Sequence, residues 1–201
     1  MYKEFILKFG DLAKTLSLED WKTTSLEDLD SDTEWVAIVT DDAEVYLNEI
    51  NAIVTKMKHP KTCFVIDLHL CANYKHLQKL WDNYIMTDRE SVEVLLSFIH
   101  HHLVNHSMIS FTIQDFRECS VPYPLVKAVS VDIGRNAPVD PKAQALCYGL
   151  CFEQVSELGT SYVNAFAKTT DEIGEGKSVP WSIQNSSDNV IEAIFFYERK
   201  F

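Results

Sequence analysis

The chain has 201 residues, of which 46% are hydrophobic and 24% charged, and its net charge at neutral pH is −12. This composition is typical of a globular protein with one well-developed core, and it excludes a disordered chain. The 30 acidic residues against 18 basic ones exclude binding to a nucleic-acid backbone, which needs a basic surface to replace the counterions. No apolar run reaches the roughly 18 residues of a membrane span. The first ten residues show no signal-peptide pattern, so we expect a cytoplasmic protein.

The first 70 residues predict helices and strands in alternation. Apolar spacing predicts helices over 2–16 and 43–58, and compact β-prone runs predict strands over 34–40 and 62–70. The strand–helix–strand order over 34–70 is typical of two parallel strands joined by a right-handed crossover.

Helical spacing continues over 71–85 and 87–106. The second of these helices has capping-box spacing at its start, with Thr87 and Glu90 three residues apart. A strand is predicted over 107–113. The five cysteines form an odd set without a CxxC pair, which predicts reduced, buried thiols.

The last third contains five of the six glycines, and its alternating segments predict an antiparallel meander with strands over 125–133, 143–155, 161–169, 179–184 and 189–201. Segment 142–155 fits a helix equally well. The sequence Gly176-Lys177-Ser178 resembles the end of a phosphate-binding loop, but Asp171 stands where that motif requires glycine and Pro180 disfavours a following helix. We therefore predict a hairpin turn over 169–181.

Together these patterns predict an α+β fold. Its mixed sheet has helices in the N-terminal two thirds and an antiparallel, β-rich C-terminal third. We expect a single domain over 1–201, with possible sub-lobes at 1–120 and 121–201. The pattern leaves the oligomeric state open.

Acidic residues are densest in segment 17–35, where seven of them stand against one lysine. A solvated loop is one explanation, and a surface that binds a basic protein is the other. Because no complete catalytic motif is present, the first functional hypothesis is a non-catalytic protein, such as an inhibitor, an immunity-type protein or an adaptor, without a cofactor. Its predicted contact residues for the basic partner are Glu27, Asp28, Asp30 and Asp32.

The alternative hypothesis is a metal-dependent hydrolase. His102 and His106 have the i,i+4 spacing that lets two imidazoles on a helix bind one metal ion. Asp67 and His69 share a strand face and could complete the set for a divalent transition metal that activates water. Structural or solvated histidines explain the same spacing, so whether the protein is an enzyme stays open at this point.

Overall fold

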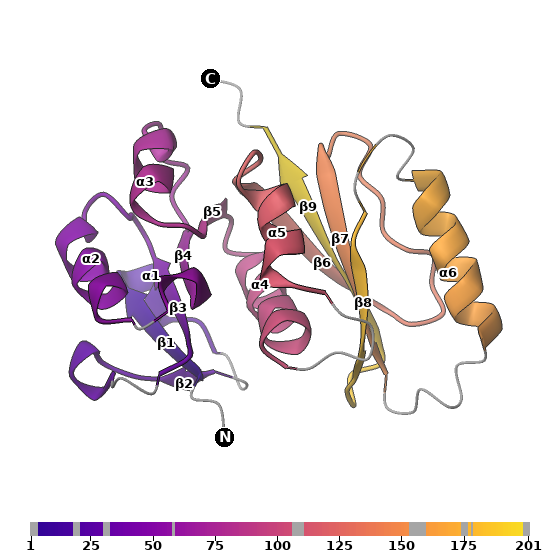
Figure 1. Cartoon of the computed structure of the whole chain (residues 1–201), viewed down its shortest axis with the longest axis horizontal. Helices are drawn as coiled ribbons and strands as arrows, with labels where there is room; N and C mark the ends of the chain where they lie inside the picture. Colours follow the sequence, from indigo (N-terminus) through magenta and orange to yellow (C-terminus); the bar gives the residue numbers. More distant parts are fainter. Residues whose placement is uncertain are drawn as a thin grey trace.

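The computed structural model describes residues 4–17, 21–29, 33–57, 59–105, 111–152, 160–173, 177 and 179–198. Within these residues one nine-stranded sheet runs through the molecule in the order β2-β1-β3-β4-β5-β6-β9-β7-β8 (Figure 1). The strands are β1 Glu4–Phe9, β2 Lys22–Thr23, β3 Trp35–Thr40, β4 Cys63–Asp67, β5 Tyr84–Thr87, β6 Leu125–Asp132, β7 Ala145–Phe152, β8 Trp181–Asn185 and β9 Val190–Tyr197.

The sheet is largely parallel. Strands β2, β1, β3, β4, β5 and β6 pair in parallel, as do β7 and β8, whereas β9 runs antiparallel to both β6 and β7. The helices are α1 Asp11–Lys14, η1 Leu26–Asp28, α2 Leu47–Lys56, η2 Pro60–Thr62, α3 Tyr74–Leu80, α4 Val92–Phe98, η3 Ile99–Val104, α5 Ile113–Ser120 and α6 Thr160–Ile173. No helix among the described residues is long and apolar enough to cross a membrane.

Helices cover both faces of the sheet. On one face, α4, η3 and α5 pack across the junction between β5, β6 and β9, with Phe98 and Phe116 fully buried in the largest apolar cluster. On the other face, α2 and α3 cover strands β1 to β5, and α6 covers β7 to β9 (Figure 1). Continuous apolar strands such as β4 follow from this arrangement, because a parallel sheet is buried on both sides.

Several predicted elements are confirmed. Strands occupy 35–40 and 63–67 and pair in parallel with α2 between them, and strands also occupy 125–132, 181–185 and 190–197. Segment 142–155, which fitted a helix or a strand, contains the strand β7. All five cysteines are buried and lie outside any disulfide.

The predicted helix over 2–16 is wrong. Residues 4–9 form strand β1, in which Phe5, Ile6 and Leu7 are buried in succession against both faces of the sheet. In a surface helix at least one of three consecutive residues is exposed. The burial of three residues in a row therefore fits a central strand, which is covered on both faces. Gly10, with φ of 98°, then turns the chain into the four-residue α1.

The predicted helices over 71–85 and 87–106 are shorter than expected, because residues 84–87 form the buried strand β5. Thr87 therefore caps no helix and donates its hydroxyl to the Val126 carbonyl instead. Of the predicted strand over 107–113, residues 107–110 lie outside the described residues. Thr112 is the N-cap of α5, where it forms a capping box with Asp115.

The predicted antiparallel meander is also wrong. Segment 161–169 belongs to helix α6, whose apolar side chains recur at helical spacing over 14 residues. The prediction of a strand used only the nine residues 161–169, in which the same side chains suggest alternation. Because α6 ends at Ile173 and the chain then enters β8, the turn at 169–181 joins a helix to a strand and is not a hairpin. Residues 174–176 and 178 lie outside the described part.

Candidate metal centre and the carboxyl edge of the sheet

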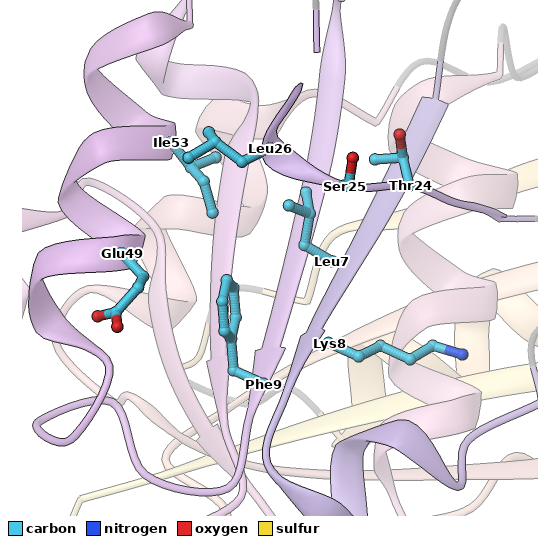
Figure 2. A pocket seen from close by; sticks show the side chains of 8 residues that line it. All are labelled: Leu7, Lys8, Phe9, Thr24, Ser25, Leu26, Glu49 and Ile53. Atoms are coloured by element: carbon cyan, nitrogen blue, oxygen red, sulfur yellow. The ribbon is translucent and has the colours of Figure 1, made fainter. Parts of the chain in front are cut away.

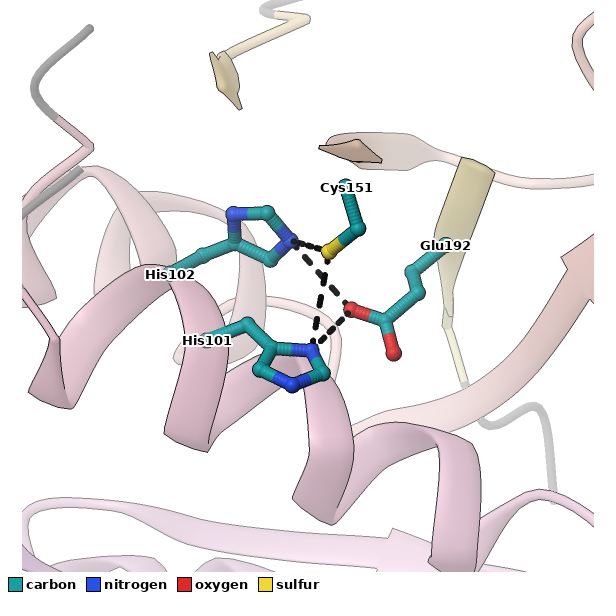
Figure 3. Close-up of side chains that lie close together, drawn as sticks. All are labelled: His101, His102, Cys151 and Glu192. Carbon is teal, nitrogen blue, oxygen red and sulfur yellow. Dashed lines mark hydrogen bonds and ion pairs between the residues drawn. The ribbon is translucent and has the colours of Figure 1, made fainter. Parts of the chain in front are cut away.

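Four side chains with metal-binding atoms meet between helix η3 and the sheet: His101, His102, Cys151 and Glu192 (Figure 3). The two histidines come from η3, Cys151 from β7 and Glu192 from β9. One ligand atom from each residue lies within 4.8 Å of all the others. The four residues are at most 7% exposed, so the group is enclosed in the protein.

The separations within this cluster are uniform. His101 Nδ1 and His102 Nε2 lie 3.4 and 3.2 Å from the same Glu192 oxygen, Oε2. The Cys151 sulfur lies 3.6 Å from His101 Nδ1 and 3.5 Å from His102 Nε2. The second nitrogen of each ring faces a further partner, because His102 Nδ1 is 2.6 Å from the Ser182 hydroxyl and His101 Nε2 is 3.7 Å from an Asp188 carboxylate oxygen.

The charges of the cluster are strongly perturbed. Burial acts to raise the pKa of Glu192, but hydrogen bonds and charges from both histidines outweigh it and lower the pKa to about 2. Burial lowers the pKa of His102, against the opposing effect of Glu192, and burial raises the pKa of the Cys151 thiol. Burial thus disfavours the charged forms of His102 and Cys151, whereas the two histidines favour the charged form of Glu192.

Local backbone features make room for the cluster. Helix η3 is a π-helix, closed by the bond from Asn105 N to the His100 carbonyl, and such wide turns often mark functional sites. On β7, Gly149 leaves the space that the His102 ring fills, since a Cβ atom there would lie 2.0 Å from His102 Nε2. Glycine at this position thus permits the close approach of β7 and η3.

The structure describes three of the four predicted metal ligands, Asp67, His69 and His102, and does not bring these three together in one site. His102 belongs to the cluster above, whereas His69 is 58% exposed at its side chain and lies 3.6 Å from the Asp42 carboxylate. Asp67 is buried and accepts hydrogen bonds from the Tyr84 hydroxyl at 2.7 Å and the His69 backbone at 3.0 Å. His106 lies outside the described residues.

Sequence reasoning missed His101, Cys151 and Glu192. An α-helical wheel directs His101 to solvent, and only the π-helix turns both neighbouring histidines inward. Glu192 did carry a signal, because a lone carboxylate inside an apolar, buried strand requires a polar partner.

Replacement of Asp67 by asparagine tests the cost of its buried charge. Burial raises the pKa of Asp67 above its usual value, so the folded state binds a proton more readily than the unfolded state, and ionisation at neutral pH destabilises the fold. We expect Asp67→Asn to gain stability relative to the wild type at neutral pH, and the difference to shrink as the pH falls towards the unfolded value of about 3.9. Urea unfolding across this range measures it, and a pH-independent difference would contradict the prediction.

The predicted acidic contact segment is only partly described. Glu27 and Asp28 are exposed on η1, and Asp28 accepts a hydrogen bond from the Ser25 hydroxyl. Asp30 and Asp32 lie outside the described residues. Beside η1 is a mainly apolar pocket between β1 and α2 (Figure 2), whose lining residues are Leu7, Lys8, Phe9, Thr24, Ser25, Leu26, Glu49 and Ile53.

The carboxyl edge of the parallel strands is where open α/β sheets usually bind ligands. At the first turn, after β1, a carboxylate of the protein itself occupies the backbone donors: Asp41 accepts from Leu12 N at 2.9 Å and from Ala13 N at 2.7 Å. Gly10 permits this contact, since a Cβ there would lie 2.3 Å from the Asp41 carboxyl carbon.

The sheet order, with β9 antiparallel to β6 and β7, defines a mixed α/β fold. The structure is similar to CetZ from Methanosaeta thermophila, with a TM-score of 0.55, 12% identity, and coverage of 85% of this chain and 64% of that one. It is also similar to an FtsZ mutant from M. jannaschii, with a TM-score of 0.50, 8% identity, and coverage of 82% and 66%. The chain thus spans slightly less than two thirds of either protein's length. No protein-family model and no curated protein sequence matches it.

These likenesses correct the functional hypotheses drawn from the sequence. The interpretation as an inhibitor, immunity-type protein or adaptor for a basic partner is wrong, because the chain has the fold of FtsZ and CetZ. The alternative of a metal-dependent hydrolase is wrong on the same ground. At 8–12% identity the similarity establishes the fold and the sheet topology, and the function has to be argued from the residues of this chain.

Proposed function

We propose that this chain is a structural protein of the FtsZ/tubulin-like fold that associates head to tail with copies of itself and binds no nucleotide at the carboxyl edge of its parallel strands. The observation that carries the proposal is the carboxylate of Asp41. It takes the two backbone N–H groups after β1, the kind of donors that bind a phosphate group in nucleotide-binding α/β proteins.

The surroundings of this edge also disfavour a nucleotide. Asp11, Asp42, Glu44 and Asp88 follow β1, β3 and β5 and are at least partly exposed, so phosphates would meet like charge. Phosphate-binding turns need glycines that let the backbone approach the ligand. Gly10 is the only glycine before residue 133, and Asp41 fills the space beside it.

Apolar side chains at the same edge support a protein contact instead. Leu12, Val45 and Leu70, in the segments after β1, β3 and β4, are 56%, 68% and 48% exposed. Because these three strands are neighbours and parallel, their carboxyl ends lie at one edge of the sheet. An apolar group rimmed by charges is typical of a protein–protein contact.

The amino edge of the parallel strands offers a complementary surface. Leu80 ends α3 before β5, and Val121 follows α5 before β6. Both are exposed, and the side-chain amide of Gln78 on α3 donates a hydrogen bond to the Val121 carbonyl at 3.0 Å. Lys61 and Lys79 lie exposed at the same edge. Two different surfaces with exposed apolar side chains at opposite edges suit a heterologous contact between copies.

The nucleotide half of the proposal is tested by titrating the protein with GTP in the presence and absence of Mg²⁺, by calorimetry, together with a phosphate-release assay. We expect neither saturable binding nor hydrolysis. Tight, saturable binding of GTP would overturn the proposal.

The association half is tested by sedimentation velocity over a range of protein concentrations without nucleotide. We expect species larger than the monomer to grow with concentration, and Val45→Asp to abolish them. Val139→Asp is the matched control, because Val139 is 51% exposed on the loop between β6 and β7, away from the edge formed by β1, β3 and β4. A wild type that stays monomeric, or an equal effect of both variants, would contradict head-to-tail association.

A further inference from the structure

We infer that His101, His102, Cys151 and Glu192 bind one zinc ion in a closed structural site that joins the π-helix η3 to strands β7 and β9. The inference stands apart from the proposed association, since it concerns the interior of the molecule. It rests on the spacing of the ligand atoms, on the orientation of both imidazoles and on the burial of the cluster.

Four of the six separations between the ligand atoms match those of a tetrahedron around zinc. With Zn–N and Zn–O distances of about 2.1 Å and a Zn–S distance of about 2.3 Å, two light ligand atoms lie about 3.4 Å apart, and nitrogen and sulfur about 3.6 Å. The corresponding separations here are 3.4 and 3.2 Å for His101 and His102 to Glu192, and 3.6 and 3.5 Å for the same nitrogens to Cys151. The four side chains point toward one another, and these separations surround one small volume (Figure 3).

Hydrogen bonding explains these separations less well. His101 Nδ1 lies 3.4 Å from the Glu192 carboxylate and 3.6 Å from the Cys151 sulfur, and the Ser97 hydroxyl is also near it, at 3.3 Å. A well-formed bond from nitrogen to oxygen is 2.7–3.2 Å long and joins one donor to one acceptor. The two contacts that join His101 Nδ1 to the other proposed ligands, Glu192 and Cys151, are longer than a well-formed hydrogen bond to oxygen and match the spacing of ligands around a shared ion.

The orientation of both rings agrees with metal binding. A metal-binding histidine usually directs its second nitrogen to a hydroxyl, carbonyl or carboxylate that holds the ring in place. His102 meets the Ser182 hydroxyl at 2.6 Å through Nδ1, which leaves Nε2 for the metal. His101 faces the Asp188 carboxylate at 3.7 Å through Nε2, which leaves Nδ1 for the metal.

The chemistry of the ligands points to zinc in a structural role. A set of two imidazoles, one thiolate and one carboxylate suits zinc, whereas magnesium and calcium prefer oxygen ligands. All four positions come from the protein and none of the residues is more than 7% exposed, so no position is left for a substrate. Catalytic zinc sites keep one position open, and structural sites do not.

Elemental analysis of the intact chain tests the inference. The protein should be expressed in zinc-supplemented medium and purified without metal-affinity chromatography, then dialysed. We expect one zinc ion per chain. After removal of zinc, cobalt(II) should restore one ion per chain and give the visible absorption of tetrahedral cobalt with a sulfur ligand.

Thermal unfolding provides the second measurement. Removal of the metal is expected to lower Tm by about 8–16 °C if zinc had been roughly 1,000-fold above its Kd. Cys151→Ser should lose the sulfur-to-cobalt absorption and most of the bound zinc. Cys63→Ser is the matched control, because Cys63 is also a buried strand cysteine but lies on β4, outside the cluster.

The outcomes decide the inference even if Cys151→Ser fails to fold, because the metal content and the cobalt spectrum are measured on the wild-type chain. Folded wild type that contains no stoichiometric zinc and takes up neither zinc nor cobalt would overturn it. So would octahedral cobalt without a sulfur band.

Discussion

Replacement of Gly149 by alanine is expected to lower the free energy of unfolding by about 3 kcal/mol, because the new methyl group would overlap a buried ring that has little room to move. The added Cβ would lie 2.0 Å from His102 Nε2 and 2.3 Å from Cδ2. The ring packs against Phe98, with centroids 4.9 Å apart, and its Nδ1 is held by Ser182. Urea unfolding of the variant and the wild type measures the loss.

A double-mutant cycle separates this overlap from other effects of the added methyl group. In the His102→Ala background the ring is absent. Gly149→Ala should then lower the free energy of unfolding by less than about 1 kcal/mol, because glycine and alanine differ little in strand propensity. Equal losses in both backgrounds would contradict the close approach of β7 and η3.

Local sequence patterns were sufficient to predict the elements whose hydrophobic pattern matches their burial. Strands β3 and β4 are uninterrupted apolar runs, and α2 between them has one apolar face with Ile50 and Ile53 fully buried. In such units the periodicity follows directly from burial on one or two faces. The parallel pairing of β3 and β4 could therefore be predicted from order alone.

The same patterns failed where the position in the sheet decides the structure. Phe5 and Phe9 have helical spacing, but β1 lies between β2 and β3, and pairing on both sides selects a strand. In the last third, Phe166 and Thr170 are buried with helical spacing because α6 crosses from β7 to its parallel partner β8. Parallel pairing requires such a crossover, and the nine-residue window over 161–169 is too short to show the helical spacing of α6.

The cluster of His101, His102, Cys151 and Glu192 could be predicted least of all. His102 was a candidate ligand, but the residues around it come from β7, β8 and β9, and the contact between His101 and Glu192 spans 91 residues. Both the wider turn of η3 and the order of β9 between β6 and β7 are needed to bring these atoms together. Neither feature has a signal in the spacing of the histidines.

Replacement of Asp41 by alanine is expected to lower the free energy of unfolding by about 2 kcal/mol, through loss of two charge-assisted hydrogen bonds to backbone N–H groups. The bonds to Leu12 N and Ala13 N join the end of β3 to the start of α1 across 28 or 29 residues of sequence. Their loss leaves both donors without this acceptor and opens a gap beside Gly10. Urea unfolding at neutral pH measures the change.

Asp42→Ala is the matched control for this prediction. Asp42 accepts from Glu44 N at 2.9 Å and from Val45 N at 3.4 Å, both within its own turn, so its loss should cost less than about 1 kcal/mol. Asp41→Asn should lie between the wild type and Asp41→Ala, because an amide oxygen still accepts a hydrogen bond but without the charge. Equal stability of Asp41→Ala and Asp42→Ala would contradict this prediction. It would mean that the Asp41 carboxylate binds the backbone N–H groups after β1 only weakly. The argument against a phosphate at that turn would then fail.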